Sequence, residues 1–155
     1  MQDISVRIAE KKDWKIVQRL NAEVFEDNAT YDDDLDLDFP YSRVGEEYYQ
    51  AAVSSPDHVC FLAEIKGEVV GYLAAEEQKI DYRKSRYVEL ANMGVSPQFR
   101  SQGIGEQLIQ ALLDWAKDHG YDRIFVSAYA SNTKAIVFYQ KNGFREIGVE
   151  LERKI

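Results

Sequence analysis

One stretch past the middle of the chain constrains the fold most, because a glycine-containing turn joins an expected strand to an expected helix. The stretch is Asn92 to Glu106, NMGVSPQFRSQGIGE. Residues before it alternate as in a strand, and those after it show helical spacing of apolar side chains. Glycines let a backbone approach a ligand, and the first N–H groups of a helix carry positive partial charge. The turn is therefore predicted to bind an anion, and Arg100 adds a full positive charge.

Length and composition favour one globular domain spanning residues 1–155. Hydrophobic residues make up 45% of the chain and charged residues 30%, which suits a folded core better than disorder. No window approaches the roughly 18 apolar residues of a membrane span, and the first residues do not follow the pattern of a secretory signal. A cytoplasmic location without a membrane partner is expected. The net charge of -8 argues against nucleic acid as the main partner.

The cysteine and the histidines indicate no metal centre. Cys60 is the only cysteine, which excludes an internal disulfide and a thiolate cluster, and its apolar neighbours predict a small buried side chain. His58 and His119 lie far apart without the spacing of a metal pair, so both are expected to be structural. No metal site is predicted.

The negative charge is concentrated in one segment. Residues 26–38 contain seven acidic residues and no lysine or arginine, and without them the balance is 19 basic against 20 acidic residues. The acidic residues are Glu26, Asp27, Asp32, Asp33, Asp34, Asp36 and Asp38. Two interpretations stay open: a wall that attracts a cationic substrate, or a solvated loop.

Periodicity predicts an α+β fold with a mixed sheet. The strand at 87–95 returns through a helix at 103–119 to a strand at 123–128, which makes these two strands parallel. Asp13 is expected to cap the first long helix and Asn132 the last one. The other expected elements are strands at 4–8, 59–65 and 68–75, helices starting at 14 and spanning 44–53, and one or two strands within 144–154.

The glycine pair alone does not decide which anion binds. A helix that simply begins with glycines would look the same. A Walker loop would have Lys-Ser or Lys-Thr after the second glycine, where Glu106 and Gln107 stand. A dinucleotide fingerprint would need a third glycine, and Gly105 is the last. Both nucleotide readings are therefore disfavoured.

Motifs beyond the turn extend the comparison. The run Val95-Ser96-Pro97, the turn from Arg100 to Gly105, Asn132 and the run FYQKNGF at 138–144 together resemble the Gcn5-related N-acetyltransferase (GNAT) superfamily. The resemblance covers Tyr87 to Phe144 in order. It implies the acyl-CoA N-acyltransferase fold, with a mixed sheet of six or seven strands, about four helices and a splay between the central parallel strands.

The resemblance also implies a cofactor. Acetyl-coenzyme A would place its pyrophosphate at the turn and its pantetheine between the strands at 87–95 and 123–128, where its amides could bond strand backbone. The residues expected to contact the cofactor are Met93, Gly94, Val95, Arg100, Ser101, Gln102, Gly103, Ile104, Gly105, Asn132, Phe138, Tyr139 and Lys141.

Acetyl transfer to a primary amine needs a base and an acid. By resemblance, Glu89 is the candidate base, although it could be an exposed strand carboxylate while a water chain does this work. Tyr139 is the candidate acid for the leaving thiolate, although it could be a core aromatic residue. Cys60 offers no case for an acyl-enzyme, so direct attack in a ternary complex is expected.

In the family, the segment between the first two helices borders the acceptor site. Tyr31, Asp32, Asp33 and Asp34 are therefore candidate substrate contacts for a cationic amine, such as a polyamine, an aminoglycoside or a protein amine. Tyrosines 41, 48 and 49 could line this pocket or pack the second helix. The rival hypothesis is a non-catalytic acyl-coenzyme A sensor or interaction module. The resemblance also makes a homodimer plausible.

Overall fold

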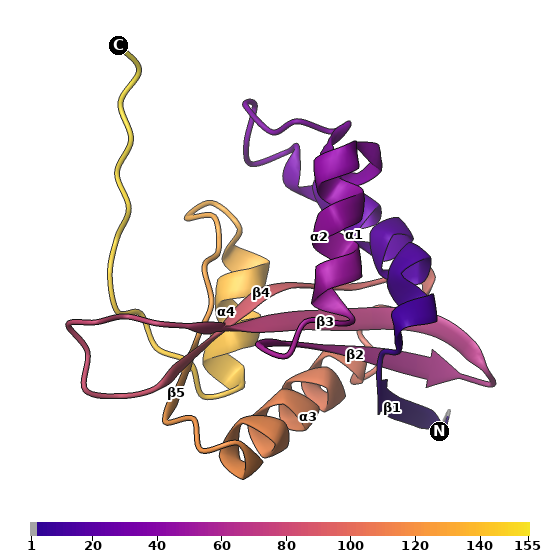
Figure 1. Cartoon of the computed structure of the whole chain (residues 1–155). Coiled ribbons are helices and arrows are strands. Elements are labelled where there is room, and N and C mark those ends of the chain that lie inside the picture. Colours follow the sequence, from indigo (N-terminus) through magenta and orange to yellow (C-terminus); the bar gives the residue numbers. More distant parts are fainter. Residues whose placement is uncertain (1–2) are drawn as a thin grey trace.

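The computed structural model describes residues 3–155 and contains one mixed five-stranded sheet in the order β1-β2-β3-β4-β5 (Figure 1). The strands are Ile4–Ile8 (β1), His58–Ile65 (β2), Glu68–Gln78 (β3), Tyr87–Val95 (β4) and Arg123–Phe125 (β5). Neighbouring strands are antiparallel up to β4, and β4 and β5 are parallel. The prediction of a mixed sheet with a parallel pair at 87–95 and 123–128 is confirmed.

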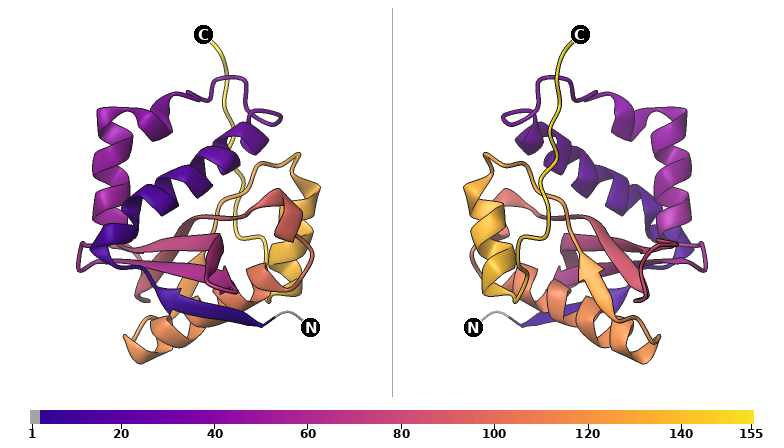
Figure 2. Two further views of the ribbon diagram at one scale, coloured as in Figure 1. Left: turned by 90° about the vertical axis from the view of Figure 1, so that its right-hand side faces the viewer. Right: turned by 90° about the vertical axis from the view of Figure 1, so that its left-hand side faces the viewer.

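Helices cover both faces of this sheet. Figures 1 and 2 show α1 and α2 on one face, α3 on the other, and α4 beside the β4–β5 end. The helices are Trp14–Asn28 (α1), Arg43–Ala52 (α2), Ile104–Asp118 (α3) and Thr133–Lys141 (α4), with single 3-10 turns at Lys11–Asp13, Phe39–Tyr41 and Pro97–Phe99. No helix within residues 3–155 is long and apolar enough to cross a bilayer.

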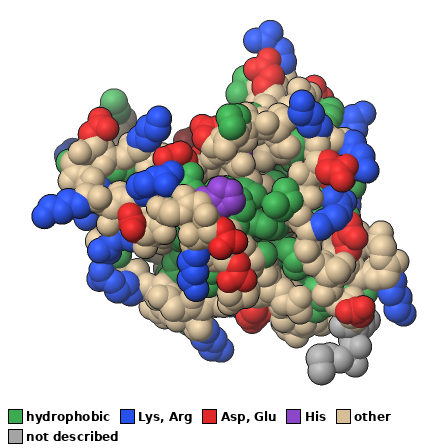
Figure 3. Space-filling model, turned by 60° about the horizontal axis from the view of Figure 1, so that its bottom comes forward, with side chains coloured by type: hydrophobic (Ala, Val, Ile, Leu, Met, Phe, Trp, Pro, Cys, Tyr) green, Lys and Arg blue, Asp and Glu red, His purple; other side chains and the backbone are tan. Residues whose placement is uncertain are grey.

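Two hydrophobic cores follow from this layering. In β2, Phe61 and Ala63 belong to the core under α3, while Cys60 and Leu62 belong to the core under α1 and α2. Because both faces are covered, the strand reads as a continuous apolar run. Cys60 is buried, and burial raises the pKa of its thiol to about 12, as expected for a structural cysteine. Figure 3 shows the α3 side, where hydrophobic side chains gather around a histidine among charged residues.

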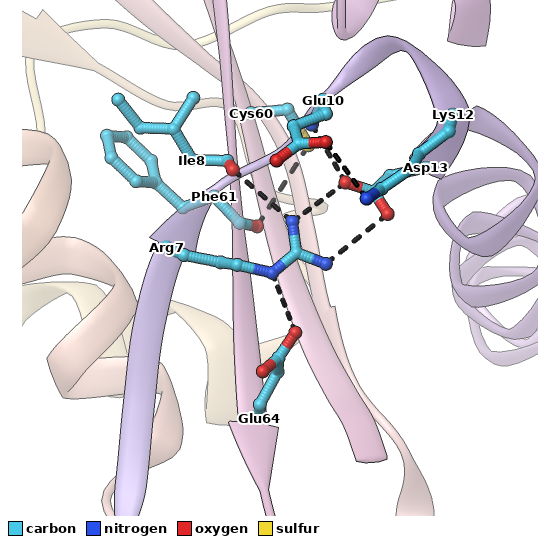
Figure 4. Close-up of polar contacts among 8 residues, drawn as sticks. All are labelled: Arg7, Ile8, Glu10, Lys12, Asp13, Cys60, Phe61 and Glu64. Atoms are coloured by element: carbon cyan, nitrogen blue, oxygen red, sulfur yellow. Dashed lines mark hydrogen bonds and ion pairs between the residues drawn. The ribbon is translucent and has the colours of Figure 1, made fainter. Parts of the chain in front are cut away.

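An ion-pair cluster joins the first strand to the first helix (Figure 4). Arg7 donates to Asp13 and to Glu64, each at 2.7 Å, and Asp13 also accepts a hydrogen bond from the backbone N–H of Glu10 at 2.8 Å. Arg7 lowers the pKa of Asp13 by this hydrogen bond. The prediction that Asp13 caps α1 is wrong, because its carboxylate turns back to these partners and makes no side-chain cap bond.

The C-terminal region differs from the expectation. Within residues 3–155 the sheet has five strands where six or seven were expected, β5 ends at Phe125 and not at residue 128, and residues 145–155 form no strand. The physical reason is pairing. β5 diverges from β4 after Phe125, and the extended tail runs away from the sheet (Figure 1), so neither segment has a hydrogen-bonded neighbour beyond that point.

Candidate functional site

The turn between β4 and α3 presents a run of free backbone donors. Ser101 and Gly103 have left-handed φ values of 61° and 82°. Within the described chain, the N–H groups of residues 101–106 donate to no protein acceptor, and the first helical bond is that of Gln107 to the carbonyl of Gly103 at 3.2 Å. A Cβ on Gly103 would meet no atom within 4 Å, so the turn is open on that side. Successive inward N–H groups at a helix N-terminus form an anion-binding concavity.

The guanidinium of Arg100 is bonded to other protein groups and is not free to face this concavity. Its Nη2 atom lies 2.6 Å from the Asp27 carboxylate, and its Nε atom donates to the carbonyl of Val95 at 2.8 Å. Both side chains of the ion pair are about half exposed. Arg100 therefore ties the turn to the end of α1, and the free donors of the turn are backbone groups.

A hollow of about 370 Å³ lies beside the turn, between the start of α3 and α4. It is lined by Glu106, Thr133, Lys134, Val137, Phe138 and Lys141. A Cβ on Gly105 would lie 2.8 Å from the ring of Phe138. Gly105 is therefore needed for the close packing of α4 on α3, and two lysines of α4 line the hollow together with Glu106.

β4 and β5 splay apart next to this turn. They pair at Tyr87↔Arg123, Val88↔Ile124 and Glu89↔Phe125, after which β4 continues to Val95 with β3 alone beside it. A bulge at Ala91 accompanies the divergence, since Leu90 pairs with Ala75 and Asn92 with Ala74. The predicted splay is confirmed. On the β5 side, backbone groups of Met93 to Val95 have no strand beside them in the described chain, and the carbonyl of Val95 accepts from Arg100.

Tyr139 lies on α4 among aromatic rings. Its ring centroid is 5.5 Å from that of Phe138 and 5.6 Å from that of Phe144, both in edge-on geometry. Its hydroxyl makes no hydrogen bond to any residue that the structure describes. Burial raises the pKa of Tyr139 to about 12, so the phenol holds its proton at neutral pH. The ring serves as packing while the hydroxyl stays available as a donor.

Glu89 lies on β4 on the face that carries α1 and α2. It is half-buried, it accepts a hydrogen bond from Gln78 at 2.8 Å, and it stands opposite Glu76 in the β3–β4 register. Burial raises the pKa of Glu89, and the nearby charge of Glu76 adds to the rise, while Gln78 opposes it. A carboxylate with a raised pKa accepts protons closer to neutral pH. Glu76 is itself held by the Nε2 atom of His58 at 2.8 Å.

A buried amide and phenol network fixes β4 from the same face. Asn92 donates to the hydroxyl of Tyr48 at 2.7 Å and accepts from Asn21 at 3.3 Å. Asn21 also donates to Tyr72 and accepts from Tyr49. Four elements, α1, α2, β3 and β4, therefore meet in one set of polar contacts. Tyr49 was expected either to line the acceptor pocket or to pack the second helix. It is fully buried, which supports packing.

The acidic segment reaches across to the loop after β5. Asp32 accepts a hydrogen bond from the Tyr129 hydroxyl at 2.8 Å, and Tyr31 stacks on the Tyr129 ring with centroids 6.1 Å apart. Asp33 and Asp34 are exposed. Two segments nearly 100 residues apart in sequence are therefore in contact, and the carboxylates of Asp33 and Asp34 are exposed beside this contact.

In the described part of the chain, no group of three or more His, Cys, Asp or Glu residues is placed to hold a metal ion.

The sequence model of the acetyltransferase (GNAT) family matches residues 12–144. The chain belongs to the GNAT family. It is 28% identical over 96 residues to mouse N-acetyltransferase family 8 member 3, covering 62% of this chain and 42% of the relative. It is 34% identical over 104 residues to rat N-acetylaspartate synthetase, covering 66% of this chain and 32% of the relative. The chain thus spans less than half the length of these curated relatives.

Solved structures agree with the GNAT fold. A mutant of the BH1408 protein from Bacillus halodurans superimposes with a TM-score of 0.85 at 22% identity, covering 97% of this chain and 99% of that one. Aminoglycoside N-acetyltransferase AAC(6')-Iy, determined in complex with CoA, gives 0.78 at 21% identity, covering 99% and 96%. At this identity the likeness shows the fold, and the fold and family predictions are confirmed.

In this GNAT chain the predicted residues fall into separate groups. Of the predicted cofactor residues, Phe138 and Lys141 line the hollow, the turn residues precede Glu106 at its rim, and Met93 to Val95 lie where β4 has separated from β5. Asn132 caps α4 as predicted, accepting from the N–H of Ala135 at 3.1 Å. Of the acidic residues, Asp32 contacts the β5–α4 loop and Asp27 pairs with Arg100 of the turn. The roles assigned to these residues stay predictions.

Sequence reasoning missed three contributors to the site. Lys134 lines the hollow with Phe138 and Lys141. Their i, i+4, i+7 spacing on one helix face could have revealed it. Tyr129 and Asn92 gave no local signal, because their partners come from distant segments.

Proposed function

We propose that the chain is an N-acetyltransferase that binds acetyl-coenzyme A and transfers the acetyl group to a primary amine in a ternary complex. One observation carries the proposal: the free N–H groups of residues 101–106 lie directly beyond the strand whose edge is released from β5. A pyrophosphate suits the donors, and an amide-bearing chain suits the strand edge. Along coenzyme A, the pantetheine amides are followed by the pyrophosphate. Along the chain, the free edge of β4 is followed by the free N–H groups in the same order.

Each part of the proposed cofactor site has a chemical match. Backbone groups of residues 93–95 would bond the pantetheine amides, and those of 101–105 the pyrophosphate. Lys134 and Lys141 add positive charge along the hollow next to Phe138. Asn132 uses its side-chain oxygen as the α4 cap, which leaves its amide NH₂ for the cofactor.

The catalytic proposal assigns one proton to each of two side chains. Acetyl-coenzyme A supplies an activated acetyl group. Glu89 takes the proton that the amine loses as its nitrogen attacks, which its raised pKa favours. Tyr139 supplies a proton to the departing sulfur, because its phenol is neutral at pH 7 and its hydroxyl has no other partner among the described residues. Positioning of amine and thioester in one site supplies much of the acceleration.

We propose a cationic acceptor, either a small polyamine or aminoglycoside or a protein amine. The support is electrostatic: Glu89 bonds the neutral Gln78, and Asp33 and Asp34 are exposed on the α1–α2 segment. Ammonium groups gain from such a field at low ionic strength. Several structural neighbours are aminoglycoside acetyltransferases, which is consistent with this class.

A thiol-release assay tests the activity. Acetyl-coenzyme A is incubated with a panel of polyamines, aminoglycosides, lysine peptides and neutral amines, and binding of coenzyme A is measured by calorimetry. The turn variant Gly103→Val, whose side chain is incompatible with the left-handed backbone, should lose binding. The matched control Gly148→Val lies in open space and should retain it. Binding without turnover on any amine would select the sensor hypothesis, and absence of binding would defeat both.

The single N-acetyltransferase domain over residues 1–155, the cytoplasmic location and the homodimer stay predictions.

A further inference from the structure

A row of three ionisable side chains crosses the sheet on the face that carries α1 and α2. His58 lies opposite Glu76 in the β2–β3 register, and Glu76 lies opposite Glu89 in the β3–β4 register. Directly opposed residues project to the same face of a sheet, and Cys60, two residues after His58, belongs to the core under α1 and α2. The candidate base therefore stands at one end of this row.

The two carboxylates of the row are like charges held close together. The side-chain amide of Gln78 donates to Glu89 at 2.8 Å and to Glu76 at 3.4 Å, so one nitrogen atom contacts both. Two carboxylates that share a site disfavour each other's ionisation. The charge of Glu76 accordingly adds to the rise in the pKa of Glu89 that burial causes.

His58 supplies the positive charge in this row. Its Nδ1 atom lies 2.9 Å from an Asp57 carboxylate oxygen and its Nε2 atom 2.8 Å from a Glu76 oxygen, and the side chain is 17% exposed. A neutral imidazole has one N–H donor, so both contacts are hydrogen bonds only when the ring carries two protons. Within residues 3–155, no lysine or arginine lies within ion-pair distance of Glu76 or Glu89. The charge that compensates the two carboxylates is therefore that of His58.

We propose that His58 is a positioning residue for the acetyl transfer: its ring, held between Asp57 and Glu76, offsets the negative charge that Glu76 places beside Glu89. Glu76 makes Glu89 a stronger base, and His58 keeps enough of Glu89 ionised near neutral pH to accept a proton. Without His58 more of Glu89 would already be protonated, and a protonated carboxyl cannot act as a base. The catalytic meaning of this row rests on the proposed function, whereas the coupling of its charges does not.

The other groups that face the row carry no compensating charge next to the candidate base. Tyr48 of α2 is close enough to both glutamates for their charges to act on it, but burial raises its pKa to about 12 and the phenol is neutral. The thiol of Cys60 is neutral for the same reason. On β5, the residue opposite the candidate base is the apolar Phe125. Lys79 acts on Asp57, at the far end of the row.

Carboxylate titration by carbon-13 NMR tests the coupling without any substrate. The full chain is labelled at its glutamate carboxyl groups, and the Glu89 signal is assigned from its absence in Glu89→Gln. The titration midpoint of Glu89 should rise by at least about 0.5 pH unit in His58→Gln and fall by a similar amount in Glu76→Gln. The double variant should match Glu76→Gln, because His58 acts through Glu76.

His119→Gln is the matched control. The His119 ring stacks on Trp115 with centroids 4.4 Å apart and bonds the Trp115 carbonyl at 2.8 Å, so it contacts neither carboxylate of the row. The midpoint of Glu89 should keep its wild-type value in this variant. An unchanged midpoint in His58→Gln would overturn the proposal, and so would a shift of the same size when Glu76 is already glutamine. Should His58→Gln unfold, an unchanged midpoint in Glu76→Gln would overturn it equally.

The pH–rate profile separates this inference from the proposed function. The low-pH limb of kcat/KM, measured by thiol release with the amine of the panel that gives the highest turnover, should move to higher pH in His58→Gln and to lower pH in Glu76→Gln. NMR midpoints that move while this limb stays in place would reject the role of His58 in the reaction. An enzyme without turnover would defeat the proposed function, and the NMR midpoints would still decide the coupling.

Discussion

Removing the Tyr139 hydroxyl should separate chemistry from folding and binding. The Tyr139→Phe substitution keeps the ring that contacts Phe138 and Phe144 and deletes a hydroxyl with no partner among the described residues. Because no intramolecular hydrogen bond is lost, the free energy of unfolding should change by less than about 0.5 kcal/mol. Any large effect must then appear in turnover.

The expected loss follows from the role of the phenol. Its pKa of about 12 means that roughly one phenol in 10,000 is ionised at pH 8. Almost every enzyme molecule therefore holds the proton that the departing thiolate needs. General acids contribute about 10²- to 10⁴-fold, so kcat should fall at least about 100-fold, or about 2.7 kcal/mol in barrier height.

The assay is thiol release at saturating acetyl-coenzyme A, with coenzyme A affinity and urea unfolding measured on the same preparations. Coenzyme A affinity should stay within about twofold, which places the loss in kcat. Tyr87→Phe is the matched control, since Tyr87 is a buried β4 tyrosine whose hydroxyl also lacks a described partner. A Tyr139→Phe enzyme with wild-type kcat would refute the acid role and leave Tyr139 as a packing residue.

Three further predictions concern charge. Glu89→Gln should lower kcat/KM about 100-fold near pH 7, with the deficit shrinking toward pH 10 as the amine loses its own proton; a pH–rate profile parallel to wild type would exclude Glu89 as base. Asp13→Asn should cost about 1–3 kcal/mol of unfolding free energy at pH 7 in urea melts. Because the folded pKa of Asp13 is lowered, this stabilisation exists above its unfolded pKa and is lost as pH falls through the folded value, so equal deficits at pH 7 and pH 3 would contradict the linkage. Asp33→Asn/Asp34→Asn should raise KM about tenfold for a polyamine at low salt and change KM little for a neutral amine; an unchanged KM for the polyamine would leave the segment as a solvated loop.

Local patterns predicted most of the elements. The Asn132 cap, the turn that joins the strand at 87–95 to the following helix, and the burial of Cys60 depend on neighbours within a few residues or on polarity alone. Those predictions held because the competing interactions were also local. Asp13 failed as a cap because Arg7, fixed on β1, and the N–H of Glu10 take its carboxylate.

Long-range geometry explains what the sequence could not show. The alternation in residues 145–155 predicted one or two strands, but these residues pair with no strand in the described chain, because pairing depends on where the tail lies and not on its local pattern. Arg100 was expected to present its charge to the anion, yet Asp27 on α1 lies 2.6 Å from its guanidinium. Tyr129 became a site residue only because Asp32 approaches from a segment almost 100 residues earlier.

The bulge at Ala91 explains how one strand can serve two surfaces. In a regular β4, pairing with β5 would continue and the backbone of residues 93–95 would be occupied by a strand. The extra residue turns Asn92 toward α1 and α2, where Tyr48 and Asn21 hold it, just where β5 departs. Buried polar contacts on one side therefore fix a strand edge that is left without a partner on the other. Unpaired backbone groups are costly, so a rigid, open edge beside the free donors of residues 101–106 makes physical sense when a ligand completes both.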